Sequence, residues 1–90
     1  MKVEFTRGFE KDLESVRDRK TLQRVERLLA DVGNAEKLSD ITGMKKLAAT
    51  RRFYRIRAGD YRVGVEIIGD TIWFLRCLPR KTIYRSFPPR

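Results

Sequence analysis

Two glycine–aspartate pairs, Gly59-Asp60 and Gly69-Asp70, divide the last forty residues of the chain into three runs of similar length. Each run is strand-like, and a Gly-Asp pair suits a two-residue turn between adjacent strands. The C-terminal part is therefore predicted to form three antiparallel strands joined by two tight hairpins. The runs are Phe53–Ala58, Tyr61–Ile68 and Thr71–Leu78.

The N-terminal half carries a different pattern. Lys2–Thr6 alternates polar and apolar residues, which predicts a short half-buried strand. Apolar residues then recur every three or four positions, which predicts a helix over Arg7–Asp18 and a second from about Leu22 to Val32, with Gly33 as its C-cap. The apolar stripes of this helical hairpin are expected to pack on the sheet. They consist of Phe9, Leu13 and Val16, and of Leu22, Val25, Leu29 and Val32.

The segment from Asn34 to Arg52 sustains no period. Met44, Leu47 and Ala48 could pin a short helical turn onto the core, and Lys45 and Lys46 form a basic pair. A connection of this length is unusual in a compact domain, so it contains either an unrecognised element or a functional loop.

The element order is thus β-α-α-β-β-β. This is an α+β fold with a mostly antiparallel sheet and a helical hairpin packed on one face. A chain of 90 residues forms one domain, here residues 1–90, with a thin core and no room for a large buried cofactor.

Composition excludes several kinds of chemistry. The chain has no histidine and one cysteine, Cys77, so it lacks imidazole bases, zinc-binding thiolate sets and an internal disulfide. We expect no metal and no cofactor. The longest clean apolar run, 72–75, is too short to cross a membrane, and no secretory signal core is recognisable, so a cytoplasmic location is expected.

Basic charge is concentrated late in the chain. The formal net charge is +9, and residues 51–90 hold ten basic and three acidic side chains. Nine of these ten cations are arginines, whose guanidinium fork fits phosphate oxygens better than a lysine ammonium does. A polyanionic partner is favoured over a merely soluble basic surface.

The first hairpin predicts where three arginines lie. With Ala58 facing Tyr61 across the turn, Arg57 faces Arg62 and Arg55 faces Gly64, all on the side away from the helices. Gly64 is expected to leave open space there. Opposed like charges destabilise a sheet by up to about 1 kcal/mol per pair, so an anionic ligand such as a phosphodiester would offset a real cost. The core side is predicted to carry Tyr54, Ile56, Ala58, Tyr61, Val63, Val65 and Ile67.

The third strand and the tail are less determined. Ile72, Phe74 and Leu78 share their parity with Arg76, unless a bulge or longer turn at Gly69-Asp70 changes it. Trp73 suits either base stacking or apolar packing. A tail returning across the sheet edge would bring Arg80 and Tyr84 to the three arginines.

Such a surface suits cleavage of RNA by its own 2′-hydroxyl, which needs charge stabilisation and proton transfer but neither metal nor histidine. The arginines are assigned charge stabilisation, because their pKa is too high for a general acid. Tyr84 is a candidate proton carrier or base stacker, unless it caps the core. Glu66 lies on the same predicted face as a candidate base or as an ion-pair partner of an arginine.

Two motifs, Tyr54–Val63 and Leu78–Arg85, resemble those of the RelE/ParE superfamily of type II toxin–antitoxin toxins. The resemblance implies a microbial RNase-like RelE fold and places the catalytic set on Arg55, Arg57, Arg62, Arg80 and Tyr84. Lysine is common at the first two positions in RelE-type members, and a histidine often stands where this chain has Pro79.

The resemblance further implies a toxin that acts as a metal-independent endoribonuclease, cuts mRNA on the ribosome and inhibits translation. It also implies an acidic cognate antitoxin as partner. Outer RNA contacts are expected from Lys45, Lys46, Lys81 and Arg85. Two alternatives stay open, namely a ParE-like gyrase-inhibiting toxin and a non-catalytic RNA-binding module.

Overall fold

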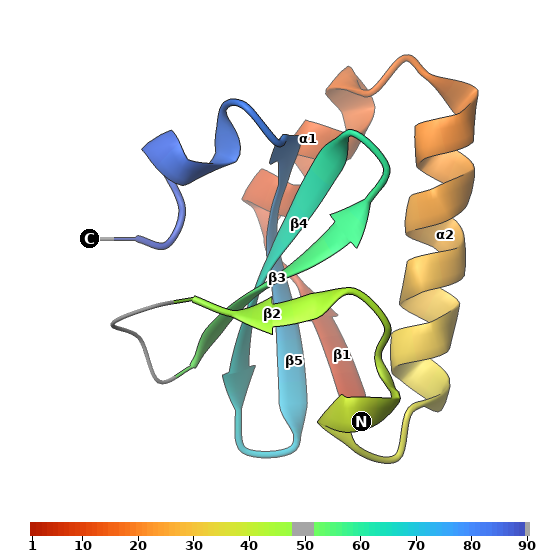
Figure 1. Cartoon of the computed structure of the whole chain (residues 1–90), viewed down its shortest axis with the longest axis vertical. Coiled ribbons are helices and arrows are strands. Elements are labelled where there is room, and N and C mark those ends of the chain that lie inside the picture. Colours follow the sequence, from red (N-terminus) through yellow and green to blue (C-terminus); the bar gives the residue numbers. More distant parts are fainter. Residues whose placement is uncertain (48–51, 90) are drawn as a thin grey trace.

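The structure is a computed structural model that describes residues 1–47 and 52–89. Within these residues, two α-helices, five strands and two 3-10 turns follow one another as Figure 1 shows. The helices are α1 (Arg7–Ser15) and α2 (Arg19–Asn34), and the 3-10 turns are η1 (Leu38–Asp40) and η2 (Ile83–Arg85). The strands are β1 (Lys2–Phe5), β2 (Met44–Lys46), β3 (Phe53–Ala58), β4 (Tyr61–Ile68) and β5 (Thr71–Pro79).

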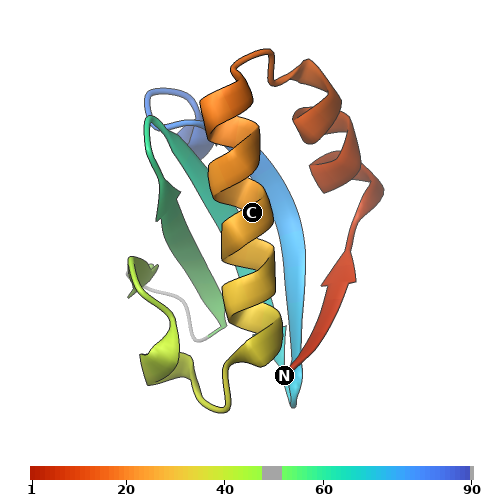
Figure 2. The same cartoon turned by 90° about the vertical axis from the view of Figure 1, so that its right-hand side faces the viewer.

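The strands form one sheet in the order β1-β5-β4-β3-β2. Among the strands of the described residues, only the β1–β5 pair is parallel, so the sheet is mostly antiparallel. Helix α2 runs along one face of the sheet, whereas the C-terminal segment lies on the opposite side (Figures 1 and 2). The predicted fold class is confirmed, with β2 as an additional strand.

The first hairpin has the predicted register. Ala58 faces Tyr61, Arg57 faces Arg62 and Arg55 faces Gly64. Both turns begin with a glycine in the left-handed region, at φ +64° for Gly59 and +60° for Gly69, where other residues are strained. The two Gly-Asp pairs therefore place the strands as predicted.

A bulge in β5 resolves the parity of the third strand. Gly64 faces Arg76 and Val65 faces Phe74, so Leu75 has no opposite residue. Phe74 consequently points into the core, while Arg76 shares the face of Gly64. The irregularity that changes the parity is thus a bulge within the strand, and not a longer turn at Gly69-Asp70.

The segment after α2 contains the element that the sequence left undecided. Met44–Lys46 forms an edge strand antiparallel to β3, with Lys45 facing Arg55. The expected helical turn is therefore wrong for Met44, which is half-buried at the sheet edge. Ala48, the last residue of that prediction, lies outside the described residues.

The helix ends follow from their capping residues. The Thr6 hydroxyl accepts from the Phe9 N–H at 3.2 Å and begins α1. Asp18 is the N-cap of α2. The Thr21 hydroxyl donates a hydrogen bond to the Asp18 carboxylate and thereby lowers the pKa of Asp18. The prediction that Gly33 caps α2 is wrong. The helix continues to Asn34, and the C-cap Ala35 has extended backbone that needs no glycine.

One core joins both helices to the sheet. Phe9 from α1 and Val25 and Val32 from α2 pack against sheet residues that are fully buried. Within residues 1–47 and 52–89, no helix is long and apolar enough to span a bilayer. The most buried sheet members of this core are Ile56, Val63, Val65, Ile72, Phe74 and Cys77.

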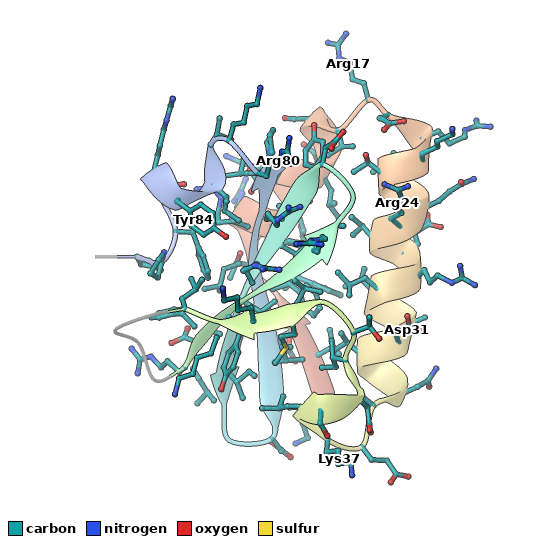
Figure 3. All side chains as sticks on the ribbon, viewed as in Figure 1. Arg17, Arg24, Asp31, Lys37, Arg80 and Tyr84 are labelled. Carbon is teal, nitrogen blue, oxygen red and sulfur yellow. The ribbon has the colours of Figure 1, made fainter. Side chains whose placement is uncertain are left out.

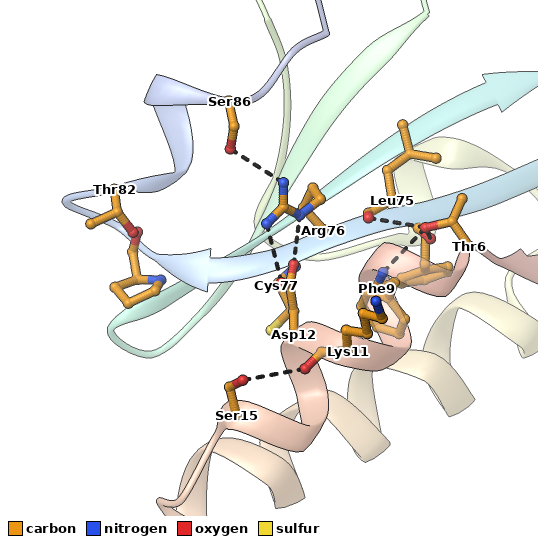
Figure 4. Close-up of polar contacts among 12 residues, drawn as sticks. Thr6, Phe9, Lys11, Asp12, Ser15, Leu75, Arg76, Cys77, Thr82 and Ser86 are labelled. Carbon is orange, nitrogen blue, oxygen red and sulfur yellow. Dashed lines mark hydrogen bonds and ion pairs between the residues drawn. The ribbon is translucent and has the colours of Figure 1, made fainter.

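Helix α1 protects the part of β5 that has no strand beside it on the β1 side. Because β1 pairs only with Thr71–Phe74, the next residues of β5 would expose their backbone at this edge. The Asp12 carboxylate accepts from the Cys77 N–H at 2.9 Å and from the Arg76 Nε at 2.8 Å (Figure 4). The hydrogen bonds that Arg76 donates to the Asp12 carboxylate raise the pKa of Arg76.

Replacing Asp12 by alanine is expected to lower the free energy of unfolding by about 2–3 kcal/mol, because it leaves a strand N–H and a guanidinium without their acceptor. Asp12→Asn keeps an acceptor and is expected to lose less. Denaturant unfolding at neutral pH measures both. An alanine variant as stable as the wild type would show that Asp12 does not hold α1 to β5.

Candidate functional site

Three arginines from β3 and β4 share the side of the sheet that faces away from α2. Arg57 lies directly opposite Arg62, and Arg55 lies opposite Gly64. Arg57 is exposed, whereas Arg55 and Arg62 are half-buried. We call Arg55, Arg57 and Arg62 the arginine face. The structure brings these three residues together as the sequence predicted.

Backbone carbonyls hold two of these guanidinium groups in place. Arg62 Nη1 donates to the carbonyls of Gly59 at 2.7 Å and Tyr61 at 2.9 Å. Arg55 Nη1 donates to the Gly43 carbonyl at 3.1 Å, in the loop before β2. Such fixed positions remove part of the reorganisation that binding an anion would otherwise require.

The electrostatics of the face favour a negative ligand. Burial lowers the pKa of Arg62, and the neighbouring charges of Arg57 and Arg55 lower it further. Within the described residues, no carboxylate forms a salt bridge with the arginine face, whereas Arg52 pairs with Glu66 at 2.7 Å. The repulsion between the three cations is thus not relieved by acidic side chains in this part of the chain.

The C-terminal segment carries Arg80 and Tyr84 to the arginine face. The Arg80 N–H donates to the Asp60 carbonyl at 2.9 Å, which ties the segment to the β3–β4 turn. Both side chains influence the pKa of Arg62, Tyr84 raising it and Arg80 lowering it. Figure 3 shows Tyr84 reaching from the segment toward the sheet. Tyr84 is 55% exposed and therefore does not cap the core.

Phe87 fills the space beside Gly64 that the sequence predicted to be open. A Cβ at Gly64 would lie 2.8 Å from three carbons of the Phe87 ring. Phe87 is 1% exposed, and its ring meets the Phe53 ring edge-on with centroids 5.7 Å apart. Ile83, four residues earlier, is fully buried. The expectation of open space at Gly64 is wrong, because the tail packs there.

Glu66 and Trp73 lie at the other end of this side of the sheet. They face each other across β4 and β5, and Glu66 is held by Arg52. Four residues along a strand separate Glu66 from Arg62 by about 13 Å. The ion-pair interpretation of Glu66 is confirmed, and neither residue adjoins the arginine face.

The outer cations predicted from the sequence take different places. Lys45 faces Arg55 across β2 and β3 and so extends the arginine face, whereas Lys46 faces Tyr54 and has the opposite orientation. Lys81 lines a hollow of about 250 Å³ with Asp60, Pro79 and Arg80. Arg85 is exposed in η2.

Two features of the site could not be read from the sequence. The carbonyls of Gly43 and Gly59 that hold arginines depend on tertiary placement. Phe87 stands in a tail that carries no periodic pattern. In the part of the chain that the structure describes, no three His, Cys, Asp or Glu side chains come together as a metal site.

Comparison with known proteins places this chain and its fold in a class. The family model described as "ParE toxin of type II toxin-antitoxin system, parDE" matches residues 3–84. The class is therefore that of toxins from type II toxin–antitoxin systems. A relative, Toxin RelE3 of Methanocaldococcus jannaschii, is 42% identical over 89 residues, which cover 98% of this chain and 100% of that protein. The chain belongs to the RelE/ParE superfamily, and its full-length relative is of the RelE type.

Solved structures agree with this assignment. The RelB–RelE antitoxin–toxin complex from Methanococcus jannaschii contains a chain that is 38% identical, with a TM-score of 0.81 over 94% of this chain and 99% of that one. The archaeal RelE–RelB complex from Pyrococcus horikoshii matches with a TM-score of 0.71 and 24% identity, over 90% and 96% of the two chains. At that identity the second match shows the fold alone.

Proposed function

We propose that this toxin is a ribosome-dependent endoribonuclease that cuts mRNA and thereby stops translation. The observation that carries the proposal is the arginine face, where no carboxylate in the described residues pairs with the cations and where Arg80 and Tyr84 interact electrostatically with Arg62. Full-length similarity to a RelE toxin supports it.

The proposed reaction uses the substrate's own 2′-hydroxyl. This oxygen attacks the adjacent phosphorus, the bond to the 5′-oxygen breaks, and the products carry a 2′,3′-cyclic phosphate and a 5′-hydroxyl. Arg62 and its neighbours stabilise the charge on the equatorial phosphate oxygens, each contributing about 2–4 kcal/mol when fixed in place. The backbone hydrogen bonds of Arg62 supply that fixation.

Proton transfer falls to Tyr84 in this proposal. Arginine at positions 55 and 57, where related RNases commonly have lysine, is assigned charge stabilisation and not proton transfer. Pro79 offers no proton carrier, and Glu66 is engaged with Arg52. Tyr84 is exposed, interacts electrostatically with Arg62 and carries a hydroxyl that can exchange a proton or position a base.

The test is cleavage of mRNA in a translating extract. We expect cuts within codons, with a 2′,3′-cyclic phosphate and a 5′-hydroxyl on the products. A single 2′-deoxy substitution at the cut site is expected to abolish cleavage there, because it removes the attacking oxygen. Cleavage that survives this substitution would disprove the mechanism, and the same RNA cut without ribosomes would disprove the dependence on them.

The proposed partner is an acidic antitoxin that is partly disordered when free and folds over the basic surface. The structurally similar toxin from Methanococcus jannaschii was solved as a complex with RelB antitoxin. A net charge of +9 provides the electrostatic complement for such a chain.

A gyrase-directed toxin is the second candidate, because the matching family model is named for ParE. Inhibition of DNA supercoiling that persists in an Arg62→Ala/Tyr84→Phe variant would favour it. RNA association without strand scission, with or without ribosomes, would instead indicate a binding module. The chain has side chains suited to RNA cleavage at all five positions of the expected catalytic set, which favours the RNase over both alternatives. These positions are Arg55, Arg57, Arg62, Arg80 and Tyr84.

A further inference from the structure

A groove beside the arginine face is lined by basic side chains of α2. It has a volume of about 220 Å³ and lies where α2 meets the loop before β2 and the end of β3. Arg57 of the arginine face is among the residues that line it, so the groove borders the face at the end of β3. Its lining comprises Arg24, Arg27, Leu28 and the acidic Asp31 of α2, Thr42 of the loop, and Arg57, Ala58 and Gly59 at the β3 end.

Gly59 is the point at which α2 meets the site. Its carbonyl accepts from Arg62, and a Cβ on the same residue would lie 3.2 Å from the Cζ of Arg24. The guanidinium of Arg24 therefore rests on the β3–β4 turn, on the other side of the backbone that holds Arg62. Figure 3 shows Arg24 on α2, at the side of the sheet.

The basic surface continues along α2. Lys20, Gln23, Arg24 and Arg27 line an adjoining hollow of about 200 Å³. Lys20 and Arg24 are four residues apart, as neighbours on one helix face are, and like charges at this spacing destabilise a helix. Among the described residues none of these cations forms a salt bridge, and Asp31 is the one acidic side chain lining either space.

We propose that Lys20, Arg24 and Arg27 form a phosphate-binding track for the single-stranded RNA whose scissile linkage lies at Arg62. The inference rests on the proposed function and names where the flanking sugar-phosphate backbone runs. Continuity through Arg57 and Gly59 leads the strand from the arginine face onto α2. Arginines spaced along one helix face can each meet a successive phosphate group.

The test measures binding, so it does not depend on turnover. A fluorescent 12-nucleotide RNA with 2′-O-methyl groups, which the toxin cannot cut, is titrated with wild type and with Arg24→Gln/Arg27→Gln over a range of salt concentrations. We expect about tenfold weaker binding at low salt. The slope of log Kobs against log salt should become shallower by about 1.4, which is about 0.7 for each lost contact with a single strand.

The matched control is Arg7→Gln/Lys11→Gln on α1, which removes the same charge from a helix face where Glu10 and Glu14 also stand. It is expected to keep the wild-type slope. The variant Arg24→Lys/Arg27→Lys keeps both charges and should have nearly the wild-type slope. This result would show that the glutamine variant loses the slope through its missing charges and not through misfolding.

An Arg24→Gln/Arg27→Gln variant with the wild-type slope would overturn the track, even if its binding to empty ribosomes were weakened. Equal effects of the α1 and α2 variants would overturn it too, since they would reflect net charge alone. A shallower slope confined to α2 would support the track even if 2′-deoxy substitution failed to stop cleavage, so the two proposals fail separately.

Discussion

Substituting Arg62 by alanine is expected to lower the rate of mRNA cleavage by about 10²–10³-fold while the fold survives. Arg62 is the member of the arginine face whose guanidinium is held by two backbone carbonyls, at 2.7 and 2.9 Å. In addition, the pKa of Arg62 is lowered, first by burial and then by the charges of Arg57 and Arg55. Removing it takes away the most ordered positive charge near the scissile phosphate.

Two variants make this result specific. Arg52→Ala removes the same charge from the same side of the sheet, but at the Glu66 end, and is expected to leave the rate within about twofold. Arg62→Lys keeps a charge without the planar fork and is expected to fall between wild type and alanine. Single-turnover cleavage on programmed ribosomes measures all three. A wild-type rate in Arg62→Ala would contradict the assigned role.

Replacing Phe87 by alanine is expected to cost about 3–4 kcal/mol of packing and to free the C-terminal segment. Phe87 lies flat on Gly64 and meets Phe53 edge-on, so its ring anchors the tail to the sheet. Because the segment carries Arg80 and Tyr84, cleavage is expected to drop by at least about 10²-fold. Phe87→Leu keeps part of the contact and should restore part of both losses.

Three measurements separate undocking from general unfolding. Trypsin should cut faster after Arg80, Lys81 and Arg85 in Phe87→Ala, while circular dichroism of the sheet is retained. Gly64→Ala should have a similar effect, since its methyl group would meet the ring. Adding Tyr84→Phe to Phe87→Ala should cost little further activity. Full additivity of these two substitutions would show that Phe87 does not position Tyr84.

The sheet was predictable where turn chemistry and alternation agree. Gly59 and Gly69 adopt the positive φ that a tight turn needs, and this fixes the strand ends on either side. Once Ala58 faces Tyr61, the placement of Arg57 and Arg62 follows from the two-residue period of a strand. The arginine face was therefore predictable from local rules alone.

Other elements depend on tertiary contacts that local patterns do not report. Strand β2 has three residues, too few for any period to show, and it forms because β3 offers a free edge. No residue type in β5 indicates that Leu75 forms a bulge. Gly33 looked like a helix end, yet α2 continues to Asn34, and the buried residue that follows it is Ala35.

The position of the tail was only conditionally predictable. The sequence could say that Arg80 and Tyr84 would reach the site if the chain returned across the sheet. What makes it return is the burial of Ile83 and Phe87, two apolar residues in a short segment without a recognisable element. The ring of Phe87 packs on the backbone of Gly64, which has no side chain there. The residues next to Gly64 in the sequence give no sign of this contact.

The single cysteine of the chain has a practical consequence. Cys77 is 1% exposed, and burial followed by the nearby Asp12 charge raises the pKa of its thiol to about 12. At neutral pH almost no thiolate forms, so Cys77 should not react with alkylating reagents or mild oxidants. A fluorophore or spin label can thus be attached to a cysteine newly introduced in the tail, with the native sulfur left in place, to follow the approach of RNA directly.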